Sequence, residues 1–285
     1  MGVPVCRPVR SAPALVRLLA LVVALTAPSA AAAQGPSISI TNSCAFSIWL
    51  GQTPNSGFAP LPSSNPNPGA RLDSGQTANY SIPADGWGGR FWPKTGCDSD
   101  GNNCQAGSSV PPCPATGCQP PADTKVEFFY SPLASGSRPY YDITLVDGYA
   151  LPVKIVPSQS DGGRCTQTNC ALSLAACPSD EIGGLGNLQV VKDGQVVQCL
   201  SPCKRWNYPP PWGQGKPETQ QPGEQFCCPT PPVSPGECRA GLIEQTKYVS
   251  LVRAECPSAY SYTYDDTGGS HDCPPGTSFV ATICP

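Results

Sequence analysis

Residues Tyr140 to Pro152 read YYDITLVDGYALP, and the fold class follows most directly from this stretch. Its first half alternates, with the apolar side chains of Ile143 and Leu145 on one face. A period of two over β-branched and aromatic residues is typical of a β-strand. Asp147 and Gly148 then predict a turn, because glycine adopts a positive φ at little steric cost.

Two carboxylates frame this predicted strand, Asp142 near its start and Asp147 at its end. In a straight strand they would lie roughly 16 Å apart, at about 3.3 Å per residue, whereas a bend near Asp147 would bring them closer. Taken alone, such acids are typical of solvated charges at a sheet edge. The alternative hypothesis is that both face a functional cleft.

Other short alternating segments predict an all-β sandwich. These segments are Ser37 to Trp49, Ala78 to Pro83, Gly88 to Trp92, Lys125 to Tyr130 and Val153 to Val156. KVEFFY carries Glu127 among aromatic residues, where an acid costs free energy unless it is paired, hydrogen-bonded or in a wet cleft. Asn79-Tyr80-Ser81 is a sequon, which makes Asn79 a candidate glycosylation site on the surface.

The composition changes after Pro157. Nine cysteines follow between Ser158 and Cys256, with a helix-like stretch from Leu172 to Ile182. Strand patterns return only at Leu188 to Val197, Lys247 to Val252 and Phe279 to Ile283. We expect a second, loop-rich domain held by disulfides. The Pro-rich run from Tyr208 to Gly223 predicts an exposed insertion, with a ligand for a proline-recognition module as the alternative.

The N-terminal residues 1–33 have the pattern of a secretory signal peptide. Three arginines precede the apolar run LLALVVAL, Leu18 to Leu25, and small residues follow it. Cleavage is expected near Ala33 or Gln34. No other stretch approaches the roughly 20 apolar residues of a transmembrane segment. We therefore expect a secreted, extracellular protein without a membrane span.

Charge and cysteine content exclude several classes of function. Without the signal, 14 basic and 20 acidic residues give a net charge of −6, which disfavours nucleic-acid binding. Sixteen cysteines remain, an even number that predicts eight disulfides in an exported chain. His271 is the only histidine, so a histidine-ligated metal site and a Ser-His-Asp triad are both disfavoured. We expect no metal and no cofactor.

The chain resembles the thaumatin-like proteins, the fifth pathogenesis-related class, over essentially its whole mature length. The motifs that carry the resemblance occur in the family's order: GGRFWPKTGC from Gly88, VEFF, YYDITLVDGYALP, Cys227-Cys228, CPSAYSYTYDD from Cys256, and the closing Cys284-Pro285. The chain departs from the usual pattern at Pro93-Lys94, at Ala150 and in the long 208–223 insertion.

The resemblance implies a disulfide pairing that spacing alone cannot give, since sixteen cysteines allow very many connectivities. The implied pairs are Cys44 with Cys284, Cys97 with Cys104, Cys113 with Cys118, Cys165 with Cys273, Cys170 with Cys256, Cys177 with Cys199, Cys203 with Cys227, and Cys228 with Cys238. In the loop-entropy model the first of these bridges contributes about 5 kcal/mol, because it closes nearly the whole chain.

The resemblance also implies the domain arrangement and the binding cleft. A flattened antiparallel β-sandwich would comprise residues 34–157 and 278–285, a helix and loop domain 158–256, and a small disulfide-linked subdomain 257–277. A cleft between the first two would be lined by one Arg, one Glu and three Asp. The matching residues are Arg90, Glu127, Asp142, Asp147, and Asp265 with Asp266 as the alternative.

This acidic cleft allows two kinds of sugar chemistry. Carboxylates that share a groove raise one another's pKa, and glycoside hydrolysis needs a protonated acid beside an ionised one. Glu127, flanked by apolar residues, would be the general acid, and Asp142 or Asp147 the base or nucleophile. Arg90 would hold one aspartate ionised. The second possibility is binding without cleavage, on aromatic side chains such as Phe91, Trp92 and Tyr149.

Three functions therefore stay open. The first is a monomeric defence protein that binds β-1,3-glucan or a related cell-wall polysaccharide and acts against fungi. The second is a weak endo-β-1,3-glucanase that uses Glu127, Asp142 and Asp147. The third is a secreted scaffold that binds or inhibits a protein target. Arg90 and the acids could also form a buried structural network, because buried ion pairs often specify a fold without adding stability.

Overall fold

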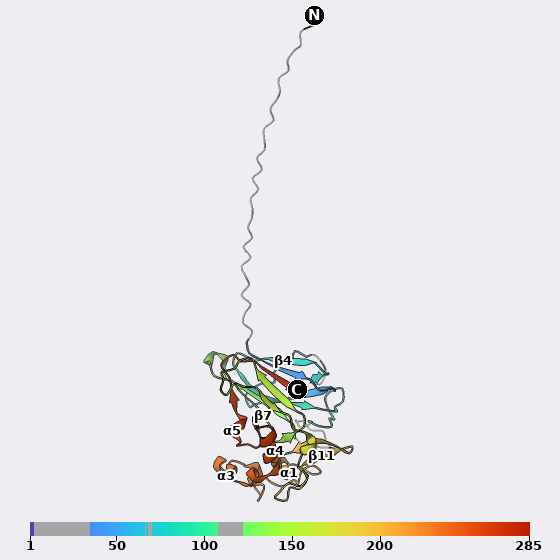
Figure 1. The fold of residues 1–285 in the computed structure, drawn as a ribbon, viewed down its shortest axis with the longest axis vertical. Coiled ribbons are helices and arrows are strands. Elements are labelled where there is room, and N and C mark those ends of the chain that lie inside the picture. Colours follow the sequence, from blue (N-terminus) through green and yellow to red (C-terminus); the bar gives the residue numbers. More distant parts are fainter. Residues whose placement is uncertain (3–34, 66, 68–69, 108–121) are drawn as a thin grey trace. The chain divides into compact units, whose positions relative to one another are not determined.

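The computed structural model describes residues 1–2, 35–65, 67, 70–107 and 122–285 (Figure 1). Gly35–Pro285 forms one compact unit, which is described here by itself. The predicted signal segment and both Cys113 and Cys118 lie outside the described residues. Among the described residues, no helix is long and apolar enough to cross a membrane.

One sheet of the unit has five strands in the order β10-β9-β15-β1-β4. Its strands are β1 (Ser37–Asn42), β4 (Thr77–Ser81), β9 (Val153–Pro157), β10 (Thr168–Cys170) and β15 (Phe279–Ile283). β1 and β15 run parallel, and the other neighbours are antiparallel. The first and last strands of the unit therefore lie side by side, so the two ends of the fold are joined by backbone hydrogen bonds.

The larger sheet has seven strands, with the path β13-β7-β6-β5-β2-β3 and β14 paired to β7. Its strands are β2 (Ile48–Pro54), β3 (Arg71–Leu72), β5 (Trp87–Lys94), β6 (Lys125–Tyr130), β7 (Tyr140–Thr144), β13 (Ala259–Tyr260) and β14 (His271–Asp272). β7, at the start of the stretch quoted first, pairs with three other strands. It thereby connects the sandwich to the C-terminal segment.

The two sheets pack face to face through aromatic side chains. Phe279 of β15 contacts Tyr141 and Phe128 of the other sheet, with ring centroids 4.6 Å and 5.4 Å apart. Tyr80 of β4 contacts Phe91 of β5 in the same way, at 4.7 Å. All five rings are buried. The predicted mainly-β sandwich is confirmed, and its core occupies one face of each sheet.

A region rich in loops, short helices and disulfides covers residues 171–256. It contains a three-stranded sheet in which β12 pairs with both β11 and β8. The third strand of this sheet, β8 (Gly148–Tyr149), comes from the segment after β7. The elements within 171–256 are η3 (Leu174–Ala176), β11 (Gln189–Lys192), β12 (Gln195–Leu200), α1 (Pro202–Asn207), α2 (Glu224–Cys227), α3 (Pro235–Arg239), η4 (Leu242–Gln245) and α4 (Lys247–Glu255). Outside it lie η2 (Leu133–Ser135) and α5 (Asp266–Gly269).

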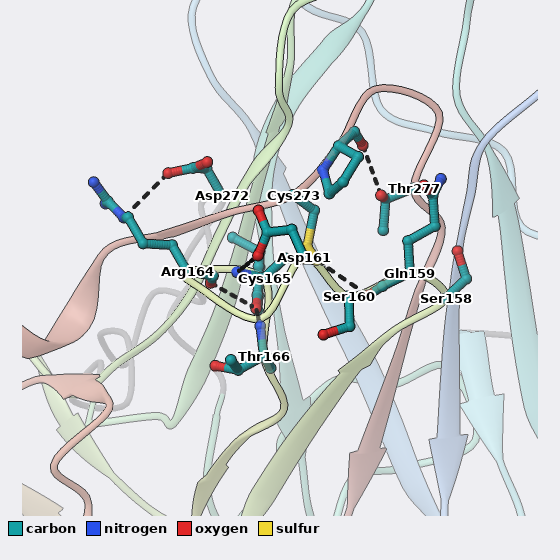
Figure 2. Close-up of a disulfide and its surroundings, with 12 residues drawn as sticks. Ser158, Gln159, Ser160, Asp161, Arg164, Cys165, Thr166, Asp272, Cys273 and Thr277 are labelled. Atoms are coloured by element: carbon teal, nitrogen blue, oxygen red, sulfur yellow. Dashed lines mark hydrogen bonds and ion pairs between the residues drawn. A yellow bond between two sulfur atoms is a disulfide. The ribbon is translucent and has the colours of Figure 1, made fainter.

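Seven disulfides of the implied pairing are present among the described residues. They join Cys44 to Cys284, Cys97 to Cys104, Cys165 to Cys273, Cys170 to Cys256, Cys177 to Cys199, Cys203 to Cys227, and Cys228 to Cys238. Figure 2 shows the bridge between Cys165 and Cys273, beside which Arg164 pairs with Asp272 at 3.1 Å. This bridge joins the loop after β9 to the chain just beyond β14.

Two sequence-based predictions of secondary structure are wrong. The expected helix at Leu172 to Ile182 reduces to the single turn η3. The expected strand at Lys247 to Val252 is the helix α4, which buries Tyr248, Val249 and Val252 on one side. Its N-terminus is capped by Thr246 and by the buried carboxylate of Glu181, so long-range hydrogen bonds outweigh the strand propensity of its residues.

Candidate functional site

The site begins with three charged residues that lie in one row across neighbouring strands. Because strand side chains alternate, Phe91, Phe128 and Tyr141 point into the core. Their neighbours Arg90, Glu127 and Asp142 therefore point to the outer face of the sheet. The register places Arg90 opposite Glu127, and Glu127 opposite Asp142. β5, β6 and β7 each contribute one member of this row, called here the charged row.

A second row lies beside the charged row on the same face of the sheet, two residues away from Glu127 on β6 and from Asp142 on β7. It contains Lys125 of β6, Thr144 of β7 and Tyr260 of β13, which are paired in register. Both rows line a pocket of about 320 Å³ together with Val146, Asp147 and Thr263. The floor of the pocket is therefore the outer face of the sheet, and the turn after β7 closes one side.

Arg90 and Glu127 form the exposed edge of the charged row. The Nη1 atom of Arg90 lies 3.4 Å from Oε1 of Glu127, and the two side chains are 44% and 36% exposed. A pair this open to water contributes little to stability. Both groups therefore keep hydrogen-bonding capacity for a ligand. The expectation that Arg90 pairs with an aspartate is wrong, because the strand register puts Glu127 opposite it.

Asp142 occupies the inner end of the charged row. Its Oδ1 atom is buried and has no hydrogen-bond partner within the described part of the chain. Burial raises the pKa of Asp142 well above its ordinary value, and the negative charge of Glu127 raises it further. Asp142 thus keeps its proton to a higher pH than an ordinary aspartic acid does.

Asp147 has the opposite character. Its Oδ2 atom lies 2.5 Å from Nζ of Lys125, and its Oδ1 atom lies 3.1 Å from Nζ of Lys204 in α1. Burial alone would favour the neutral acid, but the two lysine charges and their hydrogen bonds outweigh it and lower the pKa of Asp147 to about 2. A carboxylate held by two cations is a weak base, so Asp147 is an anchor for the lysines.

The predicted distance between the two aspartates changes because the strand does not run straight. β7 ends at Thr144, and a turn closed by a hydrogen bond from Gly148 N to Leu145 O at 3.0 Å follows. Asp142 and Asp147 consequently line the same pocket.

The pocket continues into a second one of about 220 Å³. The two share Val146, Asp147 and Thr263. The remaining walls of the second pocket come largely from the disulfide-rich region, including Lys204, Glu218 and Phe226. The combined groove is elongated, with carboxylates and cations at several places along it. Such a shape suits a chain-like polar ligand better than a compact one.

Neither Asp265 nor Asp266 lines this groove, which corrects the expectation for the third aspartate. Asp265 is buried and accepts hydrogen bonds from Arg253 of α4, at 2.8 Å, and from the hydroxyl of Ser261. It lines a separate pocket with Arg253. Asp266 pairs with Arg239 at 2.6 Å. Each aspartate pairs with an arginine that does not line the groove.

Comparison with known proteins identifies the chain. The model of the thaumatin family matches residues 42–285. The chain belongs to the thaumatin family. The charged row, the lysine-bound Asp147 and the seven described disulfides are thus features of a thaumatin family fold.

Related proteins cover nearly the full length of this thaumatin family member. A glucan endo-1,3-beta-glucosidase of Prunus avium is 33% identical over 277 residues, covering 94% of this chain and 98% of that protein. Thaumatin-like protein 2 of Prunus persica is 30% identical over 279 residues, covering 93% and 97%. Among solved structures, a family 64 laminaripentaose-producing beta-1,3-glucanase from Paenibacillus barengoltzii has a TM-score of 0.53 and 13% identity. The match covers 88% of this chain and 75% of that chain, and at this identity it shows similarity of the fold alone.

The aromatic residues expected in the cleft are in the interior of the thaumatin fold. Phe91, Trp92 and Tyr149 are at most 2% exposed, so none of them can stack on a ligand in this structure. Tyr260 is the aromatic residue that lines the pocket instead. Burial raises its pKa to about 12, and its hydroxyl donates to Asp266 at 3.1 Å.

Lys125 and Lys204 are functional residues that sequence reasoning missed. Lys125 begins KVEFFY two positions before Glu127, so strand alternation alone could have placed it on the same face. No comparable signal marks Lys204, because it reaches the groove from a helix whose position depends on tertiary structure.

One group of metal-binding residue types lies near the groove. The sulfur atoms of Cys203 and Cys227 and a carboxylate oxygen of Glu218 lie within 4.8 Å of one another. The two sulfur atoms are bonded to each other, so neither is a thiolate that could bind a metal. This group does not fit a metal ion.

Proposed function

We propose that this thaumatin family member is a secreted defence protein that binds β-1,3-glucan or a related cell-wall polysaccharide in the groove. The observation that carries the proposal is the gathering of Arg90, Glu127, Asp142 and Asp147 around one elongated groove. The proposed polysaccharide target fits a 33% identical relative named for β-1,3-glucan hydrolysis.

The chemistry of the groove suits a chain of hydroxyl groups. Glu127 accepts hydrogen bonds and Arg90 and Lys204 donate them, while Asp142, whose pKa is raised, donates one when it is protonated. A sugar hydroxyl both donates and accepts, so each can pair with a group of either kind. Because these groups are spread along the groove, several successive sugars could be bound at once.

Retention on insoluble β-1,3-glucan at low salt tests this proposal. We expect the folded wild-type protein to be retained. Arg90→Ala should weaken binding by at least about tenfold, the effect of losing one charge-assisted hydrogen bond. Arg71→Ala is the matched control, because the side chain of Arg71 is similarly exposed, at 45%, and pairs with Asp73, and neither residue lines the groove. Absence of retention of folded wild-type protein contradicts the proposal, and equal loss in both variants argues against a specific groove.

Weak endo-β-1,3-glucanase activity is the second candidate, and the pairing of Asp142 with Glu127 favours it. Asp142, the acid with the raised pKa, would protonate the leaving oxygen while the carboxylate of Glu127 attacks the anomeric carbon. Water, deprotonated by the Asp142 carboxylate, would then cleave the glycosyl ester and free Glu127. Directly opposed strand residues have Cβ atoms about 4.5–5.5 Å apart, so the two side chains start from adjacent positions, as the acid and the nucleophile of a retaining glycosidase must. This assigns the acid role to Asp142 in place of Glu127.

Release of reducing sugar from a soluble β-1,3-glucan tests the second candidate. We expect Asp142→Asn and Glu127→Gln each to abolish release while retention on insoluble glucan persists. NMR of the first product should show retained anomeric configuration. Full activity of either variant contradicts its catalytic role.

Secretion and antifungal action complete the proposal. Seven disulfides among the described residues fit an oxidising compartment. Expression in eukaryotic cells with residues 1–33 intact should place the protein in the medium, cleaved near Ala33 or Gln34. Purified protein should slow fungal growth in proportion to its retention on glucan, so an Arg90→Ala variant with full antifungal effect would separate the two properties.

A further inference from the structure

The row next to the charged row on the same face of the sheet carries exposed aromatic side chains. Phe129 of β6 lies opposite Tyr140 of β7. Phe129 comes two positions after Glu127 on β6, and Tyr140 comes two positions before Asp142 on β7. Residues two apart on a strand share a face and lie about 6.6–6.8 Å apart. Phe129 and Tyr140 are 40% and 49% exposed. Most other aromatic residues of the two sheets are buried in the core.

We propose that Phe129 and Tyr140 form a sugar-stacking subsite, called here the aromatic row, which binds the part of a β-linked glucan chain that extends beyond the charged row. This inference rests on the proposed binding of glucan in the groove. The same glucan chain would occupy both rows, because the aromatic row is continuous with the proposed polar site. Pyranose rings present apolar C–H faces that pack on aromatic rings, while their hydroxyl edges pair with polar groups.

Phe129 is held in place by its surroundings. A Cβ atom added at Gly88, the residue opposite it on β5, would lie 2.7 Å from Cδ2 of Phe129. The ring therefore lies over Gly88, in space that any larger side chain would occupy. Phe58 packs edge-on against the same ring, with centroids 6.4 Å apart and planes at 81°. A ring fixed in this way loses little further freedom when a ligand binds.

Tyr140 is fixed through the strand on its other side. Asp272 of β14 is its register partner and is 12% exposed at the side chain. Arg138 pairs with Asp272. Figure 2 shows that Arg164 also pairs with Asp272, next to the disulfide between Cys165 and Cys273. This network holds β14 against β7, so the backbone that carries Tyr140 is rigid and the ring projects from it toward solvent.

The order of the rows predicts how binding depends on ligand length. A short oligosaccharide can pair with the charged row and Lys204 without reaching the aromatic row. A longer chain that continues from the charged row toward Phe129 reaches both the charged row and the aromatic row. The aromatic row should therefore contribute only to long ligands, whereas Arg90 should contribute to both.

The test compares a β-1,3-linked trisaccharide with a soluble long-chain β-1,3-glucan, using calorimetry on the full mature chain. We expect Phe129→Ala and Tyr140→Ala each to weaken binding of the long glucan by about fivefold to tenfold, from the lost burial of roughly half a ring. Trisaccharide affinity should not change. Tyr140→Phe should retain the wild-type affinity for both ligands, because stacking needs the ring and not the hydroxyl group.

Phe46→Ala is the matched control, because Phe46 is 49% exposed and lies in the turn between β1 and β2. Unchanged affinity for long glucan in folded Phe129→Ala and Tyr140→Ala overturns the aromatic row and leaves the proposed groove intact. An equal loss for Phe46→Ala also overturns it, since the effect would be non-specific. A wild-type protein that binds neither ligand overturns both the proposed function and this inference.

Discussion

Glu127 lies directly opposite Asp142 on antiparallel strands, and both side chains point to the same face of the sheet. Two carboxyl groups in this relationship cannot both ionise at low cost. Burial of the Asp142 carboxyl group and the neighbouring charge of Glu127 raise the pKa of Asp142. Five residues later, two lysines lower the pKa of Asp147 to about 2. One short segment thus presents to the same groove two acids whose pKa values are shifted in opposite directions.

Asp142→Asn should make the protein more stable at neutral pH. An unfolded aspartic acid has a pKa near 3.8, and the folded protein raises it. Above pH 4 the unfolded chain loses a proton that the folded chain keeps, so the free energy of unfolding falls as the pH rises toward the folded pKa. The Asp142→Asn variant has no carboxyl group at this position, so its free energy of unfolding does not fall with pH for this reason. Thermal unfolding followed by circular dichroism should show a gain in Tm that grows above pH 4 until the pH reaches the folded pKa of Asp142, and a lower Tm at every pH would contradict it.

Asp147→Asn should destabilise the protein strongly. The change leaves the ammonium group of Lys125, which is 7% exposed, without its carboxylate. Breaking a buried ion pair by removing one partner costs about 3 kcal/mol or more. Chemical denaturation of the oxidised protein measures this loss. Asp180→Asn is the control, because the side chains of Asp180 and Lys247 are 78% and 50% exposed and their pair should contribute little.

The same aspartate should also control stability in acid. Its pKa is lowered from 3.8 to about 2, so the stabilisation is fully present above pH 4 and is lost as the pH falls toward 2. The size of that loss is about 2 kcal/mol, at 1.36 kcal/mol per pKa unit. Wild-type protein should therefore lose more stability than Asp147→Asn between pH 4 and pH 2, and parallel acid profiles for the two proteins would exclude this role.

Glu181→Gln should weaken the start of α4. The buried carboxylate accepts hydrogen bonds from the backbone N–H groups of Lys247 and Tyr248, at 3.0 Å and 2.8 Å. Hydrogen bonds to a charged group contribute about 1.5–3 kcal/mol, and the amide presents a donor where both groups need an acceptor. Hydrogen exchange at the two amides should accelerate. Glu255→Gln, at the exposed end of the same helix, should leave these rates unchanged.

Asn79 should carry an N-linked glycan when the protein passes through a eukaryotic secretory pathway. Its side chain is exposed on β4, an edge strand of the five-stranded sheet, within the sequon that ends at Ser81. Treatment with a glycosidase that removes N-glycans should lower the mass of the wild-type protein. The mass of Asn79→Gln should be insensitive to that treatment, and a wild-type protein of unmodified mass would show that the site is not used.

The sequence predicted local features of the site and missed those that depend on distant segments. Alternation in YYDIT correctly put Asp142 on the face opposite Ile143, whereas Glu127 was expected in the cleft only through the family resemblance. It could not give the register that pairs them. The expectation for Asp265 was wrong because Arg253, on α4, lies close enough to bind it. The predicted strand at Lys247 to Val252 was wrong because Glu181, 66 residues away from Lys247, caps a helix there.

By itself, the sequence determined the main β-strands of the sandwich and, in the segment from Tyr140, the face on which Asp142 lies. It could do so because side-chain direction in a strand repeats every two residues and depends on nothing distant. Only the tertiary structure decided which charges meet. The raised pKa of Asp142 opposite Glu127 follows from strand register, and the contact of Lys204 with Asp147 follows from helix α1 docking at the turn. Both depend on contacts between segments far apart in the chain, which no local pattern encodes.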